Sequence, residues 1–581
     1  MKKHSPRTLI AATAIVCTLG IAAPATANVV ADPVRYSADR AALSLNPIGT
    51  YETGIFDASA AEIVTHYPGA QRLLVVNAAE ALVEVLDVKD PNQPTKLFNL
   101  VTEGVRSGDG SRIPAGAVVN SVAVRADGLG ALAVEAPTKT DQGWLVFFDA
   151  NGDGETLGAV RVGALPDMVT FTPRGDQAVV ANEAEPAEDY SVDPEGSVSI
   201  VKLKHNRIEV PRQQDVKTAG FRSFEKNLPD GVRINGGRED ATGVQPRYPV
   251  SENLEPEYVT VAKDGRTAYV SLQEANAVAE VNLKSAKVTR IIPLGTVDRL
   301  TTPMDVSDRD DAINIANWPV KGFHQPDAIA SYTAKGKTYL VSANEGDARD
   351  WEGYSEEARV KDLGDGLPPI CEDFDTMKRN ADGSKMTVEQ LQQDENLGRL
   401  KITLADGLSA DGACYEELFT YGTRSMSIWT DKGTKVFDTA ADFERITAEA
   451  VPEFFNSNHS ESNFEGRSDD KGPEPEGVTL GEVDGRTYAF VGLERVGGVM
   501  VYDITSPVHS TFVTYVNNRD FSASVEDDPS TLGAAGDLGP EGLVFISAKD
   551  SPTGKPLLAV GNEVSGTTTM FSVDRVLKHR R

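Results

Sequence analysis

A pair of acidic residues recurs along the chain, one at the start of a β-type run and one at the end of the next run. In the five clearest copies the first acid follows a proline, and 16, 17, 18, 18 or 22 residues separate the two acids. The opening acids are Glu62, Asp167, Glu257, Asp327, Glu476 and Glu541. The closing acids are Glu135, Glu183, Glu274, Glu345, Glu494 and Glu563. Clusters of carboxylates are typical ligands of Ca²⁺, Mg²⁺ or Mn²⁺.

The acid pairs mark a repeat that predicts the fold. Two weaker copies, Glu62 to Asn77 and Asn120 to Glu135, bring the number of units to seven, and further β-type runs follow most of them. Seven sets of about four antiparallel strands predict an all-β chain folded as a seven-bladed β-propeller. The last unit has one strand too few, and we expect the stretch from Leu45 to Thr53 to supply it and so to close the ring.

The propeller would gather the acids at one place. The first two strands of each unit form a hairpin, so the start of the first and the end of the second lie at the same edge. Because the first strand lines the central channel, the acids should circle one mouth of it and hold divalent cations there, with Ca²⁺ expected and Mg²⁺ or Mn²⁺ as alternatives. For any single acid the alternative is a structural one, a cap on turn N–H groups or an ion pair with the next blade.

Basic residues stand next to several of these acids. Arg349 follows Asn344-Glu345-Gly346-Asp347, Lys471 precedes Glu476, and Arg495 follows Glu494. A phosphoryl substrate that bridges metal ions would need such cations to neutralise its remaining oxygens, so these three are the candidate catalytic residues. The alternative is that each only offsets the acids beside it.

The N-terminus predicts export. A basic segment, an apolar run from Leu9 to Ala23 and an Ala-x-Ala pattern predict a signal peptide over residues 1–27, with cleavage after Ala27. No other stretch is long and apolar enough to span a membrane. We therefore expect a secreted protein whose residues 28–581 form one propeller domain.

Two stretches interrupt the repeat, at about 202–253 and 346–421. The second contains Cys371 and Cys414, and a short helix is expected near Thr387 to Gln393. Outside the cytoplasm two cysteines predict one disulfide, with two free thiols or a metal ligand as the alternative.

Composition excludes several classes of function. The 581 residues include 87 Asp and Glu against 57 Lys and Arg, a formal net charge of −30, which argues against nucleic acid as a partner. The seven histidines form no His-x-His or His-Glu-x-x-His pattern, which disfavours a histidine-rich zinc site. No serine-hydrolase elbow, Walker loop or dinucleotide fingerprint is present.

Eight segments resemble the motifs of one family, the choice-of-anchor I group, which is similar to mesenchyme-specific cell-surface glycoproteins and to an atypical class of bacterial alkaline phosphatases. They are Ala61–Ile63, Leu165–Met168, Asn182–Pro186, Leu254–Tyr258, Ala343–Arg349, Arg467–Gly477, Gly492–Arg495 and Asn562–Thr567. The resemblance runs from about Leu45 to Val573. The sequence departs from the pattern of the family at Ala184, where glycine is usual. It also lacks the C-terminal sorting anchor of the family, which implies release of the protein or non-covalent retention.

The resemblance implies an extracytoplasmic propeller with phosphatase or phytase-like activity, and its animal relatives are associated with calcium mineral deposition. Together with the acid pairs it predicts a secreted, metal-dependent phosphoesterase acting on a small phosphorylated substrate. The first alternative is a non-catalytic calcium-binding protein that interacts with mineral or with a cell-surface component, and the second is a lactonase-like hydrolase. We expect a monomer.

Overall fold

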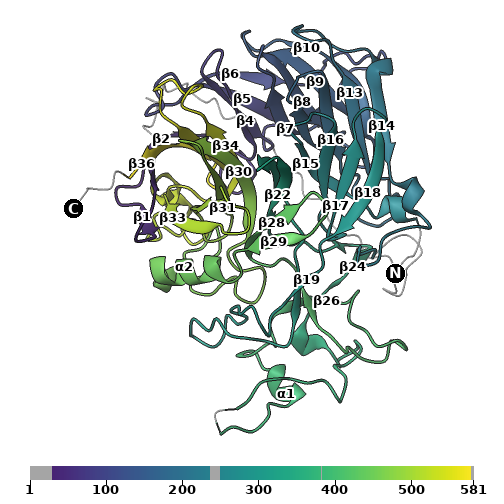
Figure 1. The fold of residues 1–581 in the computed structure, drawn as a ribbon, viewed down its shortest axis with the longest axis vertical. Coiled ribbons are helices and arrows are strands. Elements are labelled where there is room, and N and C mark those ends of the chain that lie inside the picture. Colours follow the sequence, from purple (N-terminus) through teal and green to yellow (C-terminus); the bar gives the residue numbers. More distant parts are fainter. Residues whose placement is uncertain (1–28, 236–248, 381, 577–581) are drawn as a thin grey trace, which may run out of the picture.

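Seven antiparallel sheets form a closed ring in the computed structural model (Figure 1). The structure describes residues 29–235, 249–380 and 382–576, so the signal peptide predicted at residues 1–27 lies outside it. The innermost strands of the seven sheets contact one another in chain order around the ring, and the last contacts the first. The predicted seven-bladed β-propeller is confirmed.

The first four sheets are each built from four strands that follow one another in the chain. From the channel outwards, the first two consist of β3 Val64–Tyr67, β4 Arg72–Asn77, β5 Leu82–Asp87 and β6 Thr95–Val101, then β7 Val119–Val124, β8 Leu129–Val134, β9 Gln142–Asp149 and β10 Thr156–Ala164. The next two consist of β11 Pro166–Phe171, β12 Gln177–Asn182, β13 Ser197–Lys202 and β14 Val216–Gly220, then β15 Pro256–Val261, β16 Thr267–Leu272, β17 Ala277–Asn282 and β18 Lys287–Pro293.

The last three sheets use strands from distant parts of the chain. The fifth and sixth consist of β21 Ile329–Ala334, β22 Lys337–Asn344, β28 Ser425–Thr430 and β29 Lys435–Asp438, then β30 Pro475–Val483, β31 Arg486–Leu493, β32 Val499–Asp503, β33 Thr511–Asn517 and β1 Val34–Ser37. The seventh consists of β34 Pro540–Ile546, β35 Leu557–Asn562, β36 Thr567–Arg575 and β2 Leu43–Glu52.

The ring is closed by the N-terminal part of the described chain. Strand β2 pairs antiparallel with β36 from Leu43↔Arg575 to Glu52↔Thr567, and β1 pairs with β33. In Figure 1 the purple N-terminal strands accordingly lie beside the yellow C-terminal ones. The prediction that the stretch from Leu45 to Thr53 completes the last blade is confirmed.

The second strand of each of the first four sheets is apolar on both faces, because each sheet packs between two neighbours. All six residues of β8 are buried, and so are five of the six in β4, β12 and β16. Side chains from adjacent sheets form shared hydrophobic clusters, such as the one that joins the second sheet to the third. Burial on both faces explains why these strands are continuous apolar runs rather than alternating ones.

Part of the stretch 202–253 belongs to the ring, since β14 is the outer strand of the third sheet. The stretch 346–421 leaves the ring and joins residues 295–325 in a separate layer, seen at the bottom of Figure 1. This layer has its own hydrophobic cluster around Trp318, Leu391, Ile402 and Tyr415. The disulfide predicted between Cys371 and Cys414 is confirmed and lies within it.

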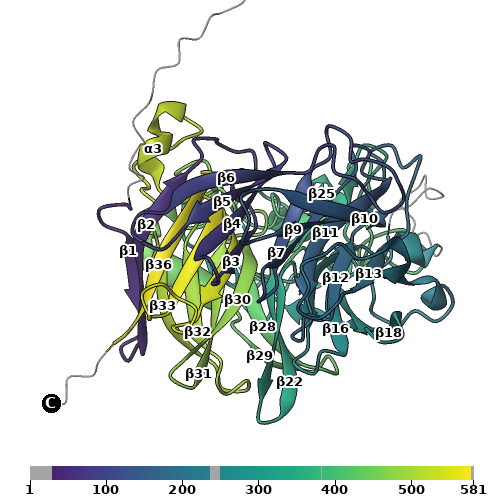
Figure 2. The same cartoon turned by 90° about the horizontal axis from the view of Figure 1, so that it is seen from above.

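The elements outside the seven sheets are short. Those of the added layer are β19 Thr296–Asp298, β20 Lys321–Phe323, β23 Asp350–Trp351, β24 Tyr354–Ser355, β25 Glu357–Arg359, α1 Val388–Leu391, β26 Lys401–Thr403 and β27 Phe419–Thr420. Helix α2 Asp442–Ala450 lies in the connection before β30, and α3 Leu532–Ala535 lies in the connection after β33, at the upper left in Figure 2. In the part of the chain that the structure describes, no helix is long and apolar enough to cross a membrane.

Replacing both Cys371 and Cys414 by serine should loosen the added layer and leave the ring intact. The disulfide closes a loop with a sequence separation of 43 residues, and losing such a constraint costs about 2–4 kcal/mol. Hydrogen exchange should accelerate in residues 360–418 and stay unchanged in β8 and β12. Equal acceleration in both regions would mean that the layer is not an independent unit of stability.

Candidate metal site at the channel mouth

Interrupted strand pairing places the opening acids at the channel mouth. In four sheets the proline before the acid pairs with the last residue of the second strand, and regular pairing resumes only three residues later, as between Pro166 and Val169. Proline fits the first position of a strand because it has no N–H to donate. Asp167 and its counterparts lie within these irregularities, which bend a strand locally and redirect its side chains.

The residue before the proline has a left-handed backbone in most of these units. The φ angles are 41° at Leu165, 40° at Gln325, 51° at Glu474 and 70° at Gly539. A non-glycine residue in this conformation costs on the order of 1–3 kcal/mol and persists where the surrounding structure holds it in place. The turn into the channel strand is therefore a strained and well-defined feature.

The structure brings the predicted acids together. Opening and closing acids of the same sheet repel each other, as do Glu257 with Glu274 and Glu476 with Glu494. The repulsion also acts between sheets, from Glu541 to Glu62 and from Glu62 to Asp167. The structure thus brings these carboxylates within electrostatic reach of one another, while the shared metal site and the cations that they would bind stay a prediction.

Burial and mutual repulsion raise the pKa values of these carboxyl groups. The pKa is raised to about 8 at Glu62, Glu274 and Glu563 and to about 7 at Asp167 and Glu345, with burial as the largest cause and neighbouring carboxylates as a further one. The same causes raise the pKa well above the usual range at Glu183, Glu257, Asp327, Glu476 and Glu541. Burial also raises the pKa of Glu135, against the lowering effect of Lys139.

Several of the acids have a carboxylate oxygen without a hydrogen-bond donor. In the described chain the buried Oε2 atoms without a partner include those of Glu62, Glu257, Glu274, Glu476 and Glu541. Burying an ionised oxygen without a donor or a cation is strongly unfavourable. These oxygens need a proton or a bound cation, and an all-oxygen donor set suits a hard divalent cation.

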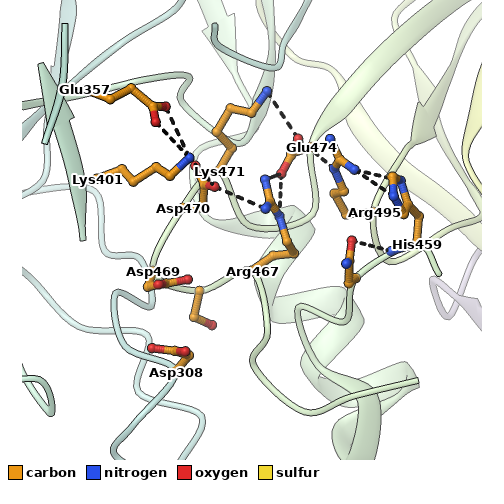
Figure 3. A network of polar contacts seen from close by, with 12 residues as sticks. Asp308, Glu357, Lys401, His459, Arg467, Asp469, Asp470, Lys471, Glu474 and Arg495 are labelled. Carbon is orange, nitrogen blue, oxygen red and sulfur yellow. Dashed lines mark hydrogen bonds and ion pairs between the residues drawn. The ribbon is translucent and has the colours of Figure 1, made fainter. Parts of the chain in front are cut away.

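One side of the mouth carries positively charged side chains of the protein itself. Glu474, which is fully buried, accepts hydrogen bonds from Arg467 at 2.9 Å and from Arg495 at 3.0 Å, and Lys471 lies 3.2 Å away (Figure 3). Lys471 also forms an ion pair with Glu345. The three cations hold the pKa of Glu474 well below its usual range despite its burial.

A histidine lies at the same place. His459 Nδ1 is 3.1 Å from the Glu494 carboxylate and 2.7 Å from the Arg495 guanidinium. Potential ligand atoms of His459, Glu494 and Glu563 all lie within 4.8 Å of one another, and the same holds for Glu345, Glu474 and Glu494. Glu494 belongs to both groups, so the two could hold neighbouring ions.

The three basic residues that are predicted to be catalytic have different surroundings. Lys471 and Arg495 reach the mouth and keep 13% and 21% of their side chains exposed. Arg349 is 1% exposed, and its terminal nitrogens bond both oxygens of Glu255 at 2.9 and 2.6 Å. The structure therefore places Arg349 behind the ring of acids, in a buried ion pair.

Sequence reasoning missed three residues of the site, Glu255, Glu474 and His459. A signal for two of them existed, because Glu-Pro-Glu occurs at 255–257 and again at 474–476. In both copies the second glutamate lies at the channel mouth and the first accepts hydrogen bonds from arginine side chains. His459 has no comparable signal, because its partners Glu494 and Glu563 are 35 and more residues away in the sequence.

Comparison with known proteins gives one family. The model of the choice-of-anchor I domain matches residues 62–507. Gigasin-3a of Magallana gigas is 28% identical over 196 residues, which are 32% of this chain and 69% of that protein. The mesenchyme-specific cell surface glycoprotein of Strongylocentrotus purpuratus is 28% identical over 292 residues, which are 45% of this chain and 36% of that protein. The chain thus spans little more than a third of the second relative.

Solved structures resemble the chain only distantly. Hydrazine synthase of Kuenenia stuttgartiensis has a TM-score of 0.40 at 13% identity, with 90% of this chain and 99% of that chain covered. The β-propeller domain of Myceliophteria thermophila Cps50 (Swd1) has a TM-score of 0.38 at 9% identity, with 91% of this chain and 100% of that chain covered.

The cation-free protein should become less stable as the pH rises. The folded-state pKa values of Glu62, Glu274 and Glu563 lie at about 8, above the ordinary value of 4.5. The contribution of these carboxyl groups to the stability of the fold is therefore fully present below about pH 4.5 and is lost as the pH rises through 8. In chelator the melting temperature should fall between pH 5 and pH 9, and excess Ca²⁺ should reduce the fall. A melting temperature that rises over this range in chelator would contradict the raised pKa values.

Glu474→Gln should destabilise the fold. The substitution leaves Arg467, Lys471 and Arg495 without their shared anion, and breaking a buried ion pair in this way costs about 3–5 kcal/mol. Urea unfolding measures the loss, and Glu482→Gln at the exposed end of β30 is the matched control. Equal stability of the two variants would show that the three cations do not depend on Glu474.

Proposed function

The chain belongs to the choice-of-anchor I family, and we propose that it is a secreted, metal-dependent phosphoesterase whose active site is the acid-lined mouth of the propeller channel. The observation that carries the proposal is the set of buried, donor-free carboxylate oxygens at the channel strands, together with the cluster of basic side chains around Glu474. A site of this kind attracts cations on one side and a multiply charged anion on the other.

The residues that would hold the cations are the acids at the mouth. The two groups with mutually close ligand atoms, His459–Glu494–Glu563 and Glu345–Glu474–Glu494, are the strongest candidates. Of these, Glu474 is already neutralised by three basic side chains, which leaves the first group and the donor-free acids beside it as the better fit. Oxygen ligands dominate, so Ca²⁺ is the expected ion and Mg²⁺ or Mn²⁺ the alternatives.

A divalent cation bound there would supply Lewis-acid polarisation of a phosphoryl oxygen and would lower the pKa of a bound water. The chain's own part is to orient the substrate and to neutralise it. Lys471 and Arg495 each remain partly exposed at the mouth, so both can present N–H donors to phosphoryl oxygens. Glu474 holds them in position, and Arg349 would support the site from behind through Glu255.

A second candidate function is non-catalytic calcium binding at a cell surface. It is favoured by the relative described as a mesenchyme-specific cell surface glycoprotein and by the disulfide, which is consistent with an extracellular place. In that case the acids would bind cations only to stiffen the ring and to present a surface to mineral or to another protein.

Hydrolysis of p-nitrophenyl phosphate tests the proposal. Protein stripped with chelator should be inactive and should regain turnover with Ca²⁺, Mn²⁺ or Mg²⁺. Glu541→Gln removes one donor-free acid from the ring and should lower the activity at limiting metal about 10–100-fold. Glu482→Gln should leave it unchanged, because this side chain lies exposed at the far end of a channel strand.

The rival functions give different results in the same assay. Absence of turnover with every metal, together with a Ca²⁺-dependent rise in melting temperature, would exclude the phosphoesterase and favour the calcium-binding protein. If none of Ca²⁺, Mn²⁺ and Mg²⁺ changes the turnover or the melting temperature, the acids at the mouth bind none of these cations and both functions are wrong.

A further inference from the structure

A polar cavity lies at the two outer strands of the second sheet, β9 and β10, at the opposite end of Figure 1 from the added layer. Its volume of 560 Å³ falls in the range of small-molecule sites, about 300–1,000 Å³. Besides β9 and β10, the loop between β6 and β7 and the loop between β8 and β9 line it. Its polar lining consists of Asp109, Arg112, Asp141, Gln142, Trp144 and Arg161.

One donor in this lining is buried and has no acceptor. Trp144 is 2% exposed, and among the described residues its indole Nε1 has no hydrogen-bond partner. Trp144 pairs directly with Arg161 across β9 and β10, and the guanidinium lies over the indole ring, 4.0 Å from its centroid. A ligand therefore meets this ring at an edge. Buried tryptophan N–H groups normally have a partner, so this donor is left for a ligand.

The Arg161 side chain is fixed in place before any ligand arrives. Its Nε donates to the Asp109 carboxylate at 3.1 Å, and its Nη1 donates to the Gln142 carbonyl at 2.6 Å. Its backbone N–H donates to the Gln213 side chain at 2.8 Å, and the Gln213 amide donates back to its carbonyl at 3.0 Å. These contacts leave Nη2 as a positioned donor. A group that is already held in this way loses little freedom when a ligand binds.

The cavity also offers acceptors, and its charges balance. The exposed side chains of Asp141 and Gln142 line it and make no hydrogen bond within the described parts of the chain. Two aspartates and two arginines face each other here, although the whole chain has a formal net charge of −30. A neutral lining of donors and acceptors matches hydroxyl groups, because each hydroxyl can both donate and accept a hydrogen bond.

We propose that this cavity binds a neutral carbohydrate. Trp144 and Arg161 would donate to the hydroxyl oxygens of the sugar, and Asp141 would accept from its hydroxyl groups. A sugar that carries sulfate, phosphate or carboxylate would bring its charge close to Asp109 and Asp141, which disfavours it. The cavity shares no residue with the acids at the channel mouth, so the proposal does not depend on the proposed hydrolysis.

An array of neutral oligosaccharides built from glucose, galactose, mannose and N-acetylglucosamine tests the site with the labelled full chain. The parent should bind at least one of them, and titration calorimetry with that oligosaccharide gives its affinity. Trp144→Phe keeps the aromatic ring and removes the N–H donor, so it should weaken binding about tenfold, the usual weight of one hydrogen bond. Asp141→Asn, at an exposed position, should give a similar loss even if Trp144→Phe fails to fold.

Two matched substitutions in the added layer serve as controls. Trp351→Phe, at a half-buried position, and Asp365→Asn, at an exposed one, should keep the affinity of the parent. Three results would overturn the proposal: binding of no neutral oligosaccharide, binding only of oligosaccharides that carry sulfate or uronic acid, or unchanged affinity in the folded variants of Trp144 and Asp141. Because the assay measures binding, a protein that is inactive on phosphate esters leaves the result decisive.

Discussion

Repulsion among the carboxylates at one mouth of the channel is the constraint to which the rest of the site responds. A propeller cannot relieve this repulsion by moving its blades apart, because each sheet packs against two neighbours and strand β2 locks the ring shut against β36. The acids are held at the starts of the channel strands and just after the second strands. Their charge must therefore be met by protons, by basic side chains or by bound cations.

The chain meets that charge unevenly. Arg467, Lys471 and Arg495 converge on Glu474 at one side of the mouth, whereas Glu62, Glu257 and Glu541 keep oxygens without donors. The mouth is therefore electrostatically divided, with basic side chains next to uncompensated carboxylates. Under the proposed function, this division would let a bound metal ion and the basic side chains bind an anion jointly.

One buried arginine helps to couple the added layer to this division, beside the ion pairs of Arg359 and Arg399 with Asp469. Arg424 bonds Glu444, Asp305 and the backbone of the segment that carries Arg467 and Lys471. The segment that carries Arg467 and Lys471 is thus held between the propeller and the loop of the added layer that contains Asp305. Its position depends on contacts between residues that lie more than a hundred positions apart.

The fold and the ring of acids could be predicted from the sequence, because a propeller repeats one short hairpin and the repeat places equivalent residues at equivalent edges. Proline followed by an acid, and a closing glutamate 16 to 22 residues later, were enough for that. The buried place of Arg349, the shared role of Glu474 and the presence of His459 were decided only by the tertiary structure. They depend on which side chains of different units meet, and local spacing carries no information about contacts between blades.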